Sequence, residues 1–371
     1  MALMARYARI AHRASDSWSN RRRGMDGRQG RAGGLATAAI VLGALLAGTG
    51  PGKAVGAEPS PALVSDGASA RPGPAHVFVI VMENHGYDDL VGAAAAPWIN
   101  DAVARYGVAD RSYAVAHPSQ PDYIALTSGG TQGVVDDRDV VIDVPNLVDQ
   151  LESQNRTWTG YMQSFDTCSG DVLRTFCGGQ LYARKHDPFV SYQDIASNPD
   201  RLVRIVDLSQ LDADLASRSV ADLAWITPDL CHDMHGISGR EDVPCAGFDD
   251  AQLIAAGDAF LEATVRSIIA SSSWTPGSVL FVTWDEAGGR DTSGCCGSEP
   301  AGGHILTLVI GYGGGSRRSQ VPYDHYSLLA TIEGLLGLPC LGQACLAKPM
   351  WDLVAVPDAP GSVLRSIRPG S

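Results

Sequence analysis

Four short apolar runs recur along the chain and predict the buried strands of a sheet. They cover residues 76–82, 221–227, 279–284 and 305–310, and each is nearly continuous in apolar residues, many of them β-branched. Runs of this length and composition are typical of parallel strands that are covered on both faces. The sequence therefore predicts a sheet with a layer of helices on either side.

Helical patterns lie between these runs, at about 97–106, 119–128, 145–154, 250–271 and 326–337. Strands that alternate with helices are the signature of an α/β fold. No low-complexity break and no internal repeat divides residues 75–358. A segment of this length can bury a large core, so we expect one domain there.

The first 57 residues have the pattern of a secretory signal peptide. Arginines at 21–23, 28 and 31 precede an apolar stretch over 35–47, and small residues at 55–57 offer a cleavage point. The apolar stretch is shorter than the roughly 20 residues that a spanning helix needs, although an uncleaved anchor is the alternative. Residues 58–74 then form a flexible lead-in and 359–371 a short tail. We expect a secreted protein without stable membrane insertion.

Charge and cysteine usage narrow the class of protein. The formal net charge is −13, and removal of the arginine-rich leader would leave a still more acidic protein. Such a charge argues against nucleic-acid binding. The eight cysteines follow the leader, and an even count in an exported chain favours disulfides. Close spacing suggests the pairs 168–177, 231–245 and 340–345. Cys295 and Cys296 then form an adjacent pair or bridge elsewhere, and a zinc site is the competing interpretation.

Acidic and amide side chains follow two of the predicted strands. Glu83 and Asn84 come after the first run, and Asp285 and Glu286 come after the third. Ligands of open α/β sheets bind at the carboxyl ends of the strands, so these side chains are expected to converge. Their oxygens suit a divalent cation, which would relieve the repulsion between adjacent acids. A capped strand end or a solvated turn is the plainer alternative for each pair.

A serine lies where an extended segment gives way to a helical pattern. Residues 116–124 read AHPSQPDYI, with Ser119 between two prolines. Proline is tolerated in the first turn of a helix, so Ser119 is expected at a helix N-terminus, where the helix dipole stabilises an anion. Such a serine could attack a phosphoryl group, with a cation held beside it. An ordinary N-cap is the alternative.

Several histidines are candidates for proton transfer or phosphate binding. His235 closes a segment over 229–235 that also holds Asp233, and His117, His186, His304 and His325 lie in other polar segments. Histidine is the usual proton donor near neutral pH. A loop clamped by Cys231, or a metal site at Asp233 or His235, is the alternative for 229–235. The chain has no Walker loop, no dinucleotide-binding glycine pattern and no Gly-x-Ser-x-Gly elbow.

Taken together, these motifs resemble the bacterial and fungal phosphoesterase family that holds secreted acid phosphatases and phospholipases C. The closest similarity is to secreted actinobacterial acid phosphatases, some of which act on phosphoinositides. The matching stretches occur in family order and are 81–84, 117–123, 182–189, 225–229, 233–235, 257–261, 283–286 and 325–329. Two departures are His232, where the family usually has Asn, and Gly236, where it has an acid.

The resemblance implies an alkaline-phosphatase-like three-layer α/β/α sandwich with a single catalytic domain. It implies one divalent metal ion and leaves a second open. The implied metal ligands are Glu83, Asn84, Ser119, Asp285 and Glu286, with Ser119 also the nucleophile. His186 and His235 would lie near the phosphate, and we expect His235 to protonate the leaving group. His117, Asp233 and His304 are the expected substrate-binding residues.

The expected substrate is a phosphomonoester, and the monoester on a phosphoinositide headgroup is compatible with it. Phospholipases of the family usually carry extra C-terminal domains, whereas this chain ends soon after residue 346. A phospholipase C or other phosphodiesterase of the same family is the first alternative. A catalytically silent secreted binding protein is the second. The sequence does not indicate an oligomeric state.

Overall fold

The computed structural model describes residues 76–168, 173–177, 180–298 and 300–354. The predicted signal peptide over 1–57, the lead-in over 58–74 and the tail over 359–371 lie outside these residues. Within the described part of the chain, no helix is both long and apolar enough to span a bilayer.

One sheet forms the centre of the domain, with the strand order β10-β2-β9-β8-β1-β7-β3-β6 and with β11 also paired to β2. Its strands are β1 (Val77–Met82), β2 (Gly107–Tyr113), β3 (Trp158–Met162), β6 (Ile205–Asp207), β7 (Leu223–Thr227), β8 (Val279–Trp284), β9 (His304–Gly311), β10 (Arg317–Ser319) and β11 (Tyr323–Asp324). A separate hairpin joins β4 (Phe176–Cys177) and β5 (Tyr182–Ala183). The four predicted strands are β1, β7, β8 and β9, and they are neighbours in this sheet.

The direction of β9 differs from the prediction. β1 is parallel to β7 and β8, but β9 is antiparallel to both β8 and β2, so the expectation of a parallel strand over 305–310 is wrong. A parallel connection needs a crossover, which is usually a helix. The described residues between β8 and β9 contain no helix, and the chain instead returns through a long loop.

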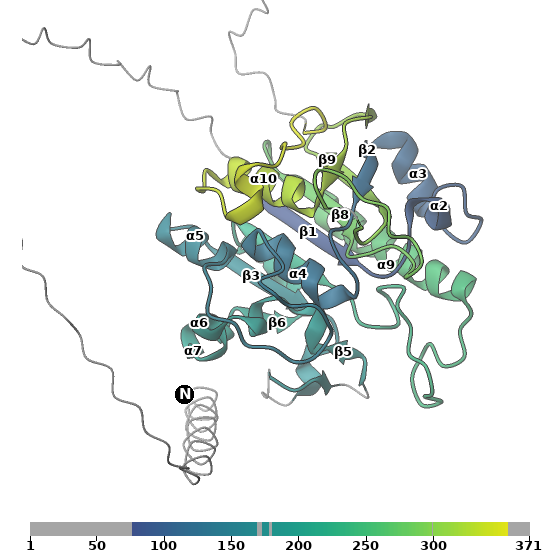
Figure 1. Ribbon diagram of the computed structural model, residues 1–371, viewed down its shortest axis with the longest axis horizontal. Helices are drawn as coiled ribbons and strands as arrows, with labels where there is room; N and C mark the ends of the chain where they lie inside the picture. The colour runs from purple at the N-terminus through teal and green to yellow at the C-terminus, as the bar shows by residue number, and fades with distance from the viewer. Residues whose placement is uncertain (1–75, 169–172, 178–179, 299, 355–371) are drawn as a thin grey trace, which may run out of the picture. The chain divides into compact units, whose positions relative to one another are not determined.

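Helices cover both faces of the sheet. Alternate residues of β1 belong to two different cores: Val77, Val79 and Val81 face one, and Phe78, Ile80 and Met82 face the other. The first core includes apolar side chains of α4 (Ser119–Ser128), α5 (Leu147–Ser153) and α10 (His325–Leu336). The second includes those of α3 (Pro97–Arg105), α8 (Gln210–Ser217) and α9 (Asp250–Ala270). Figure 1 shows α4, α5 and α10 on the near side of the strands, with α9 behind them. The predicted α/β fold with two helical layers is confirmed.

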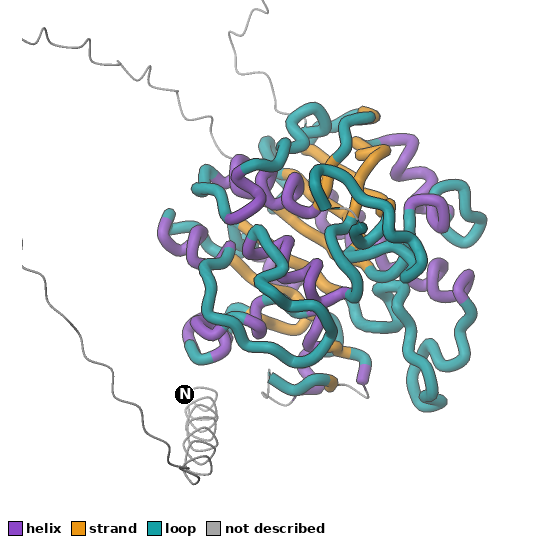
Figure 2. The backbone as a smooth tube through the Cα atoms, viewed as in Figure 1, coloured by secondary structure: helices purple, strands orange, loops and turns teal. Residues whose placement is uncertain are grey.

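Long loops join the helices (Figure 2). Their bounds are α2 (Tyr87–Leu90), α3 (Pro97–Arg105), α4 (Ser119–Ser128), α5 (Leu147–Ser153), α6 (Gln193–Ala196), α7 (Pro199–Leu202), α8 (Gln210–Ser217), α9 (Asp250–Ala270) and α10 (His325–Leu336). The five predicted helical patterns are present as α3, α4, α5, α9 and α10, whereas α2, α6, α7 and α8 were not predicted. Asp249 and Asp324 cap α9 and α10 by accepting a hydrogen bond from a backbone N–H of the first turn.

Helix α4 is buried along its whole length and positions the candidate serine. It begins at Ser119, carries Pro121 in its first turn and ends at Gly129, which has a φ of 71°. A Cβ at Gly129 would lie 2.2 Å from the carbonyl oxygen of Leu341, so both the backbone conformation and the space require glycine. The packing of α4 against α10 leaves the serine end at the carboxyl edge of the sheet.

All eight cysteines form disulfides. The pairs are Cys168–Cys177, Cys231–Cys245, Cys340–Cys345 and the adjacent pair Cys295–Cys296. The three predicted local bridges are confirmed, and the alternative that Cys295 and Cys296 bridge elsewhere is excluded. Three pairs join residues 9, 14 and 5 positions apart, whereas Cys295–Cys296 joins sequence neighbours. Disulfides are common in proteins from oxidising compartments.

Candidate active site

The two polar pairs meet because β1 and β8 are adjacent and parallel. Met82 and Trp284 are register partners at the ends of these strands, so Glu83 and Asn84 emerge beside Asp285 and Glu286. The backbone N–H of Asn84 donates to Asp285 Oδ1 at 3.0 Å. The predicted convergence at the carboxyl ends of the strands is therefore present in the structure.

Ser119 lies between these two pairs. Its hydroxyl is 3.0 Å from Glu83 Oε2 and 3.1 Å from Glu286 Oε1, and the residue is buried. Pro118 is the N-cap of α4, and Ser119 makes no capping hydrogen bond to the helix backbone. The ordinary N-cap interpretation is thus excluded, since the hydroxyl is directed at two carboxylates.

Buried carboxyl groups are concentrated around this serine. Burial, followed by repulsion from Asp285, raises the pKa of Glu83 well above its usual range. Burial and the neighbouring Glu286 raise the pKa of Asp285 to about 8. Burial likewise raises the pKa of Asp233. Each shift in pKa disfavours the ionised carboxylate, and a positive charge nearby would favour it.

Four buried atoms of this cluster make no hydrogen bond of good geometry among the described residues, although His186 lies within 3.3 Å of both Glu83 Oε1 and Asp233 Oδ2. The four atoms are Glu83 Oε1, Asp233 Oδ2, Asp285 Oδ2 and His186 Nε2. A buried polar atom without a partner is costly, and several that converge are the usual mark of a bound ion. Carboxylate oxygens and imidazole nitrogens are ligands for divalent cations. The residues present therefore fit the metal ion that the sequence predicts.

The histidines offer a second way to hold such an ion. Ligand atoms of Glu83, His186 and His235 all lie within 4.8 Å of one another. His186 is buried against Tyr123, with Nε2 3.1 Å from Glu83 Oε1 and Nδ1 3.3 Å from Asp233 Oδ2. Burial, together with Lys185 and His235, lowers the pKa of His186 well below its usual range. A neutral imidazole is the form that ligates metals.

His235 has one nitrogen held by the backbone and one directed into the cluster. Its Nδ1 lies 2.8 Å from the carbonyl oxygen of Gly236, to which it donates, and its Nε2 is 3.4 Å from the ammonium of Lys185. Burial and Lys185 lower its pKa. Asp233 positions it, because Asp233 Oδ1 accepts the backbone N–H of His235 at 2.7 Å.

His117 orients Glu286 in the free protein. Its Nδ1 forms an ion pair with Glu286 Oε2, and its Nε2 donates to the carbonyl oxygen of Asp291 at 2.8 Å. The hydrogen bond with Glu286 outweighs burial and raises the pKa of His117 to about 9. Its expected role in substrate binding remains a prediction, since both nitrogens already have partners.

His304 makes its contacts away from Ser119. Its ring stacks on Tyr87 with centroids 4.7 Å apart, and its Nε2 lies 3.0 Å from the carbonyl oxygen of Asp110. Among the described residues, no contact joins its side chain to the serine cluster. The structure thus brings together every predicted site residue except His304, whose role as a substrate ligand stays a prediction.

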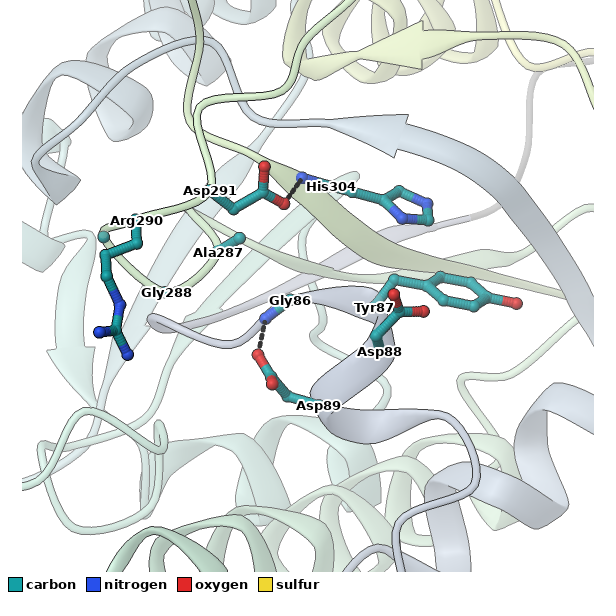
Figure 3. Close-up of a pocket in the computed structure, with 10 residues that line it drawn as sticks. Gly86, Tyr87, Asp88, Asp89, Ala287, Gly288, Arg290, Asp291 and His304 are labelled. Carbon is teal, nitrogen blue, oxygen red and sulfur yellow. Dashed lines mark hydrogen bonds between the residues drawn. The ribbon is translucent and has the colours of Figure 1, made fainter.

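A neighbouring pocket of about 410 Å³ is formed by the segments that follow the two polar pairs. Figure 3 shows its lining, in which the Asp291 carboxylate accepts a hydrogen bond from the backbone N–H of His304. The Arg290 side chain lies across the pocket from the rings of Tyr87 and His304. Its lining residues are Gly86, Tyr87, Asp88, Asp89, Ala287, Gly288, Gly289, Arg290, Asp291 and His304. Asp291 links this pocket to the serine site, because it lines the pocket and its carbonyl oxygen accepts from His117.

Sequence reasoning missed two charged residues beside the serine. Lys185 Nζ donates to Asp137 Oδ2 at 2.8 Å, and Asp137 Oδ1 accepts the backbone N–H of Gln120 at 3.0 Å. Burial disfavours the ammonium, but Glu83 and Asp137 outweigh it and raise the pKa of Lys185, so it is charged. Lys185 directly precedes His186 in a stretch that carried the family resemblance, which was the available signal. Asp137 lies in a loop with no motif.

Asp122 and His325 fix the backbone on either side of the site. Asp122 Oδ1 accepts the backbone N–H groups of Val115 and Ala116 at 2.9 and 3.0 Å, which holds the segment that leads to Ser119. His325 Nδ1 is 3.1 Å from the same oxygen. Its Nε2 lies 3.0 Å from the carbonyl oxygen of Trp284, directly before Asp285. These contacts link the entry to α4 with the end of β8.

The chain is similar in sequence to known phosphatases. The model of the phosphoesterase family matches residues 93–339. The phosphatidylinositol-3-phosphatase of Mycobacterium tuberculosis is 30% identical over 323 residues, which cover 86% of this chain and 93% of that protein. An acid phosphatase of Aspergillus fumigatus is 26% identical over 286 residues, which cover 75% of this chain but 58% of that protein. The chain thus spans somewhat more than half the length of this fungal relative.

Solved structures also resemble the domain. A protein of the alkaline phosphatase superfamily from Vibrio parahaemolyticus has a TM-score of 0.48 and 14% identity, over 74% of this chain and 70% of that one. A phosphonate monoester hydrolase from Silicibacter pomeroyi has a TM-score of 0.47 and 11% identity, over 74% of this chain and 76% of that one.

Proposed function

Since this chain belongs to the phosphoesterase family, we propose that it is a secreted, metal-dependent phosphomonoester hydrolase with Ser119 as its nucleophile. The observation that carries the proposal is the position of the Ser119 hydroxyl, at the start of α4 and between Glu83 and Glu286. Unpartnered carboxylate oxygens of Glu83 and Asp285 lie in the same cluster. A hydroxyl in this setting has a proton acceptor within hydrogen-bond distance and lies beside oxygens that suit a cation.

The ion would be held by Glu83, Asn84, Ser119, Asp285 and Glu286, with the imidazoles of His186 and His235 within reach. When bound, a divalent cation supplies a Lewis acid that neutralises a phosphoryl oxygen and favours the serine alkoxide. The identity of the ion is left to measurement.

The protein's own residues account for the proton movements. The Ser119 proton passes to a neighbouring carboxylate, Glu83 or Glu286, as Oγ attacks phosphorus in line with the leaving alcohol. The new P–Oγ bond forms while the ester P–O bond breaks, which leaves a phosphoserine and an alkoxide. Protonated His235 gives its Nε2 proton to this alkoxide. Neutral His235 then takes a proton from water, whose oxygen bonds to phosphorus as the P–Oγ bond breaks. Ser119 Oγ recovers its proton from the carboxylate, and inorganic phosphate is released.

The environment of His235 favours activity at acidic pH. Its Nδ1 is committed to the Gly236 carbonyl, so Nε2 must carry the proton that is transferred. Because burial lowers its pKa, this nitrogen is protonated only below the usual range for histidine. We therefore expect the rate with a phosphomonoester to rise as pH falls below about 6.5.

The mycobacterial relative suggests a more specific substrate. Its name describes a phosphatase of phosphatidylinositol 3-phosphate, whose headgroup phosphate is a monoester. We propose that monophosphorylated inositol lipids are accepted alongside small phosphomonoesters. Secretion is supported by the pairing of all eight cysteines in disulfides.

The experiment that tests this proposal compares two reactions of the purified, metal-supplemented protein. Release of inorganic phosphate from 4-nitrophenyl phosphate is measured against release of phosphocholine from phosphatidylcholine. A clear preference for the monoester is expected, and a preference for the lipid diester would replace the proposal with a phospholipase C. Turnover of neither substrate, with metal bound, would favour a silent binding protein.

The variant Ser119→Ala tests the nucleophile. It should lose at least 10³-fold in turnover, since among the described residues no other hydroxyl is hydrogen-bonded to both carboxylates. Its thermal unfolding should change little. Acid quenching with a radiolabelled phosphomonoester should trap phosphoserine on the wild type and not on the variant. Retention of a tenth of the wild-type rate would show that Ser119 is not the nucleophile.

A further inference from the structure

Lys185 is a cation in a cluster of carboxyl groups. The lysines of the chain are Lys53, Lys185 and Lys348, and basic positions are otherwise arginine. Among the groups that influence Glu83, Lys185 supplies the positive charge, whereas Asp285 and Asp233 add negative charge. An anionic substrate that enters this site meets strong repulsion unless a cation faces it.

The turn that carries Lys185 is held rigidly by its neighbour. The guanidinium of Arg184 is buried and donates to the carbonyl oxygens of Val140 and Val190 at 2.7 and 3.0 Å. His186, on the other side, is buried within the serine cluster. Lys185 therefore cannot swing freely, and its side chain is only 14% exposed.

Asp137 holds the ammonium next to the start of α4. One of its oxygens accepts from Lys185 at 2.8 Å and the other from the backbone N–H of Gln120 at 3.0 Å, the residue directly after Ser119. On its other side, Lys185 Nζ is 3.4 Å from His235 Nε2. The ammonium is thus fixed between the helix that carries the nucleophile and the histidine expected to protonate the leaving group.

The hydrogen-bonding capacity of the ammonium is not exhausted. An ammonium has three N–H donors, and within the described part of the chain Lys185 Nζ meets two partners, Asp137 and His235. A third donor is available to an incoming oxygen. A purely structural lysine, present only to offset the carboxyl groups, would need no donor to spare.

We propose that Lys185 binds a phosphoryl oxygen of the substrate and thereby favours the dianionic phosphate of a monoester over the monoanionic phosphate of a diester. This inference rests on the proposed function. Charge-assisted hydrogen bonds to phosphate are roughly twice as strong as neutral ones, and the Coulomb attraction of one ammonium grows with the charge of its partner. Asp137 acts as a positioning residue for this ammonium.

The test uses the metal-supplemented full-length protein and the variants Lys185→Met, Lys185→Gln and Lys348→Met. Methionine keeps the length of the side chain without its charge, and glutamine keeps a donor for Asp137 without the charge. Lys348 is an exposed lysine and serves as the matched control. For each variant, kcat and KM are measured with 4-nitrophenyl phosphate and with bis(4-nitrophenyl) phosphate, together with the inhibition constant of inorganic phosphate.

Both Lys185 variants should raise the inhibition constant of phosphate about tenfold to a hundredfold. They should also lower kcat/KM for the monoester at least fivefold more than for the diester, while Lys348→Met matches the wild type. An unchanged inhibition constant, or equal losses with the two substrates, would overturn the proposal. If Lys185→Met does not fold, Lys185→Gln decides.

A measurement on the wild type needs no variant. Inorganic phosphate should slow the modification of Lys185 by an amine-directed acylating reagent and leave Lys348 unaffected. Equal protection of both lysines, or of neither, would overturn the assignment. Failure of the proposed function appears differently: the wild type would not hydrolyse the monoester, yet phosphate would still protect Lys185.

Discussion

Asp258 and Asp285 are both buried aspartates, but the protein treats them differently. Asp258, on α9, receives the backbone N–H of Ile99 at 2.8 Å on one oxygen and that of Trp98 at 3.0 Å on the other. Asp285, after β8, receives one N–H from Asn84, and its Oδ2 has no hydrogen-bond partner among the described residues. The first carboxylate is satisfied by the chain itself and the second is not.

The difference shows that the fold can supply donors to a buried carboxylate where one is needed for structure. Asp258 uses the free N–H groups at the start of α3, behind Pro97, and so joins two helices. At the end of β8 the described residues supply only the N–H of Asn84 to Asp285, and Glu83 and Asp233 each also have one oxygen without a hydrogen bond. A structural explanation covers Asp258, whereas the unpaired oxygen of Asp285 is what the proposed cation would satisfy.

The strongest test of this contrast replaces Asp285. Asp285→Asn and Glu83→Gln should each lose the bound metal and at least 10³-fold in activity, because both oxygens are expected ligands of one ion. Without metal, the variants should be at least as stable as the wild type, since the amide resembles the protonated acid. Elemental analysis, phosphatase assays and thermal unfolding with and without added metal provide the measurements.

Added metal at a hundred times its dissociation constant should stabilise the wild type by about 2.7 kcal/mol and these variants by much less. Unchanged metal content in both variants would remove Asp285 and Glu83 from the ion's ligands.

Asp258→Asn should give the opposite result. An amide leaves one of the two N–H groups at the start of α3 without an acceptor, which should cost about 2 kcal/mol of unfolding free energy. Metal content and activity per folded molecule should match the wild type, since Asp258 lies in the contact between α3 and α9. Denaturant unfolding measures the loss, and a fall in metal content would contradict the distinction between the two aspartates.

The site residues that could be predicted from the sequence are those marked by a local pattern of apolar residues and prolines. Glu83 and Asp285 were expected to converge because each follows an apolar run, and parallel neighbouring strands end at the same edge. Ser119 was expected at a helix start because prolines flank it. These inferences needed only the periodicity of the chain and the rules of α/β sheets.

The missed features depend on contacts between distant segments. Asp137 reaches Lys185 across 48 positions of the sequence and from a loop without periodic pattern. The antiparallel direction of β9 follows from a loop that forms no helix, which apolar content cannot reveal. The sequence likewise could not show that His304 turns its ring onto Tyr87 rather than toward the serine, because tertiary stacking decides it.

Glu333 provides the test with the smallest expected effect. Its carboxyl group accepts two hydrogen bonds, as that of Asp258 does, but has one oxygen without a hydrogen bond among the described residues, as that of Asp285 does. On α10, its Oε1 accepts from the Gln150 side chain at 3.0 Å and from the Leu341 backbone at 2.8 Å, but its Oε2 has no hydrogen-bond partner in the described part of the chain. Burial outweighs these donors and raises the pKa of Glu333 to about 7. In the unfolded chain the same group ionises near its ordinary pKa of 4.5.

The sign of the pH dependence follows from these two values. A carboxyl group with a raised pKa in the folded state stabilises the protein below the unfolded pKa, and this contribution is lost as pH rises to the folded value. Glu333→Gln mimics the protonated acid at every pH, so its stability relative to the wild type should increase between about pH 5 and 7, by on the order of 1 kcal/mol. Denaturant unfolding at several pH values gives the difference directly. A constant difference from pH 5 to 8 would mean that Glu333 is ionised in the folded protein and that its two donors offset its burial.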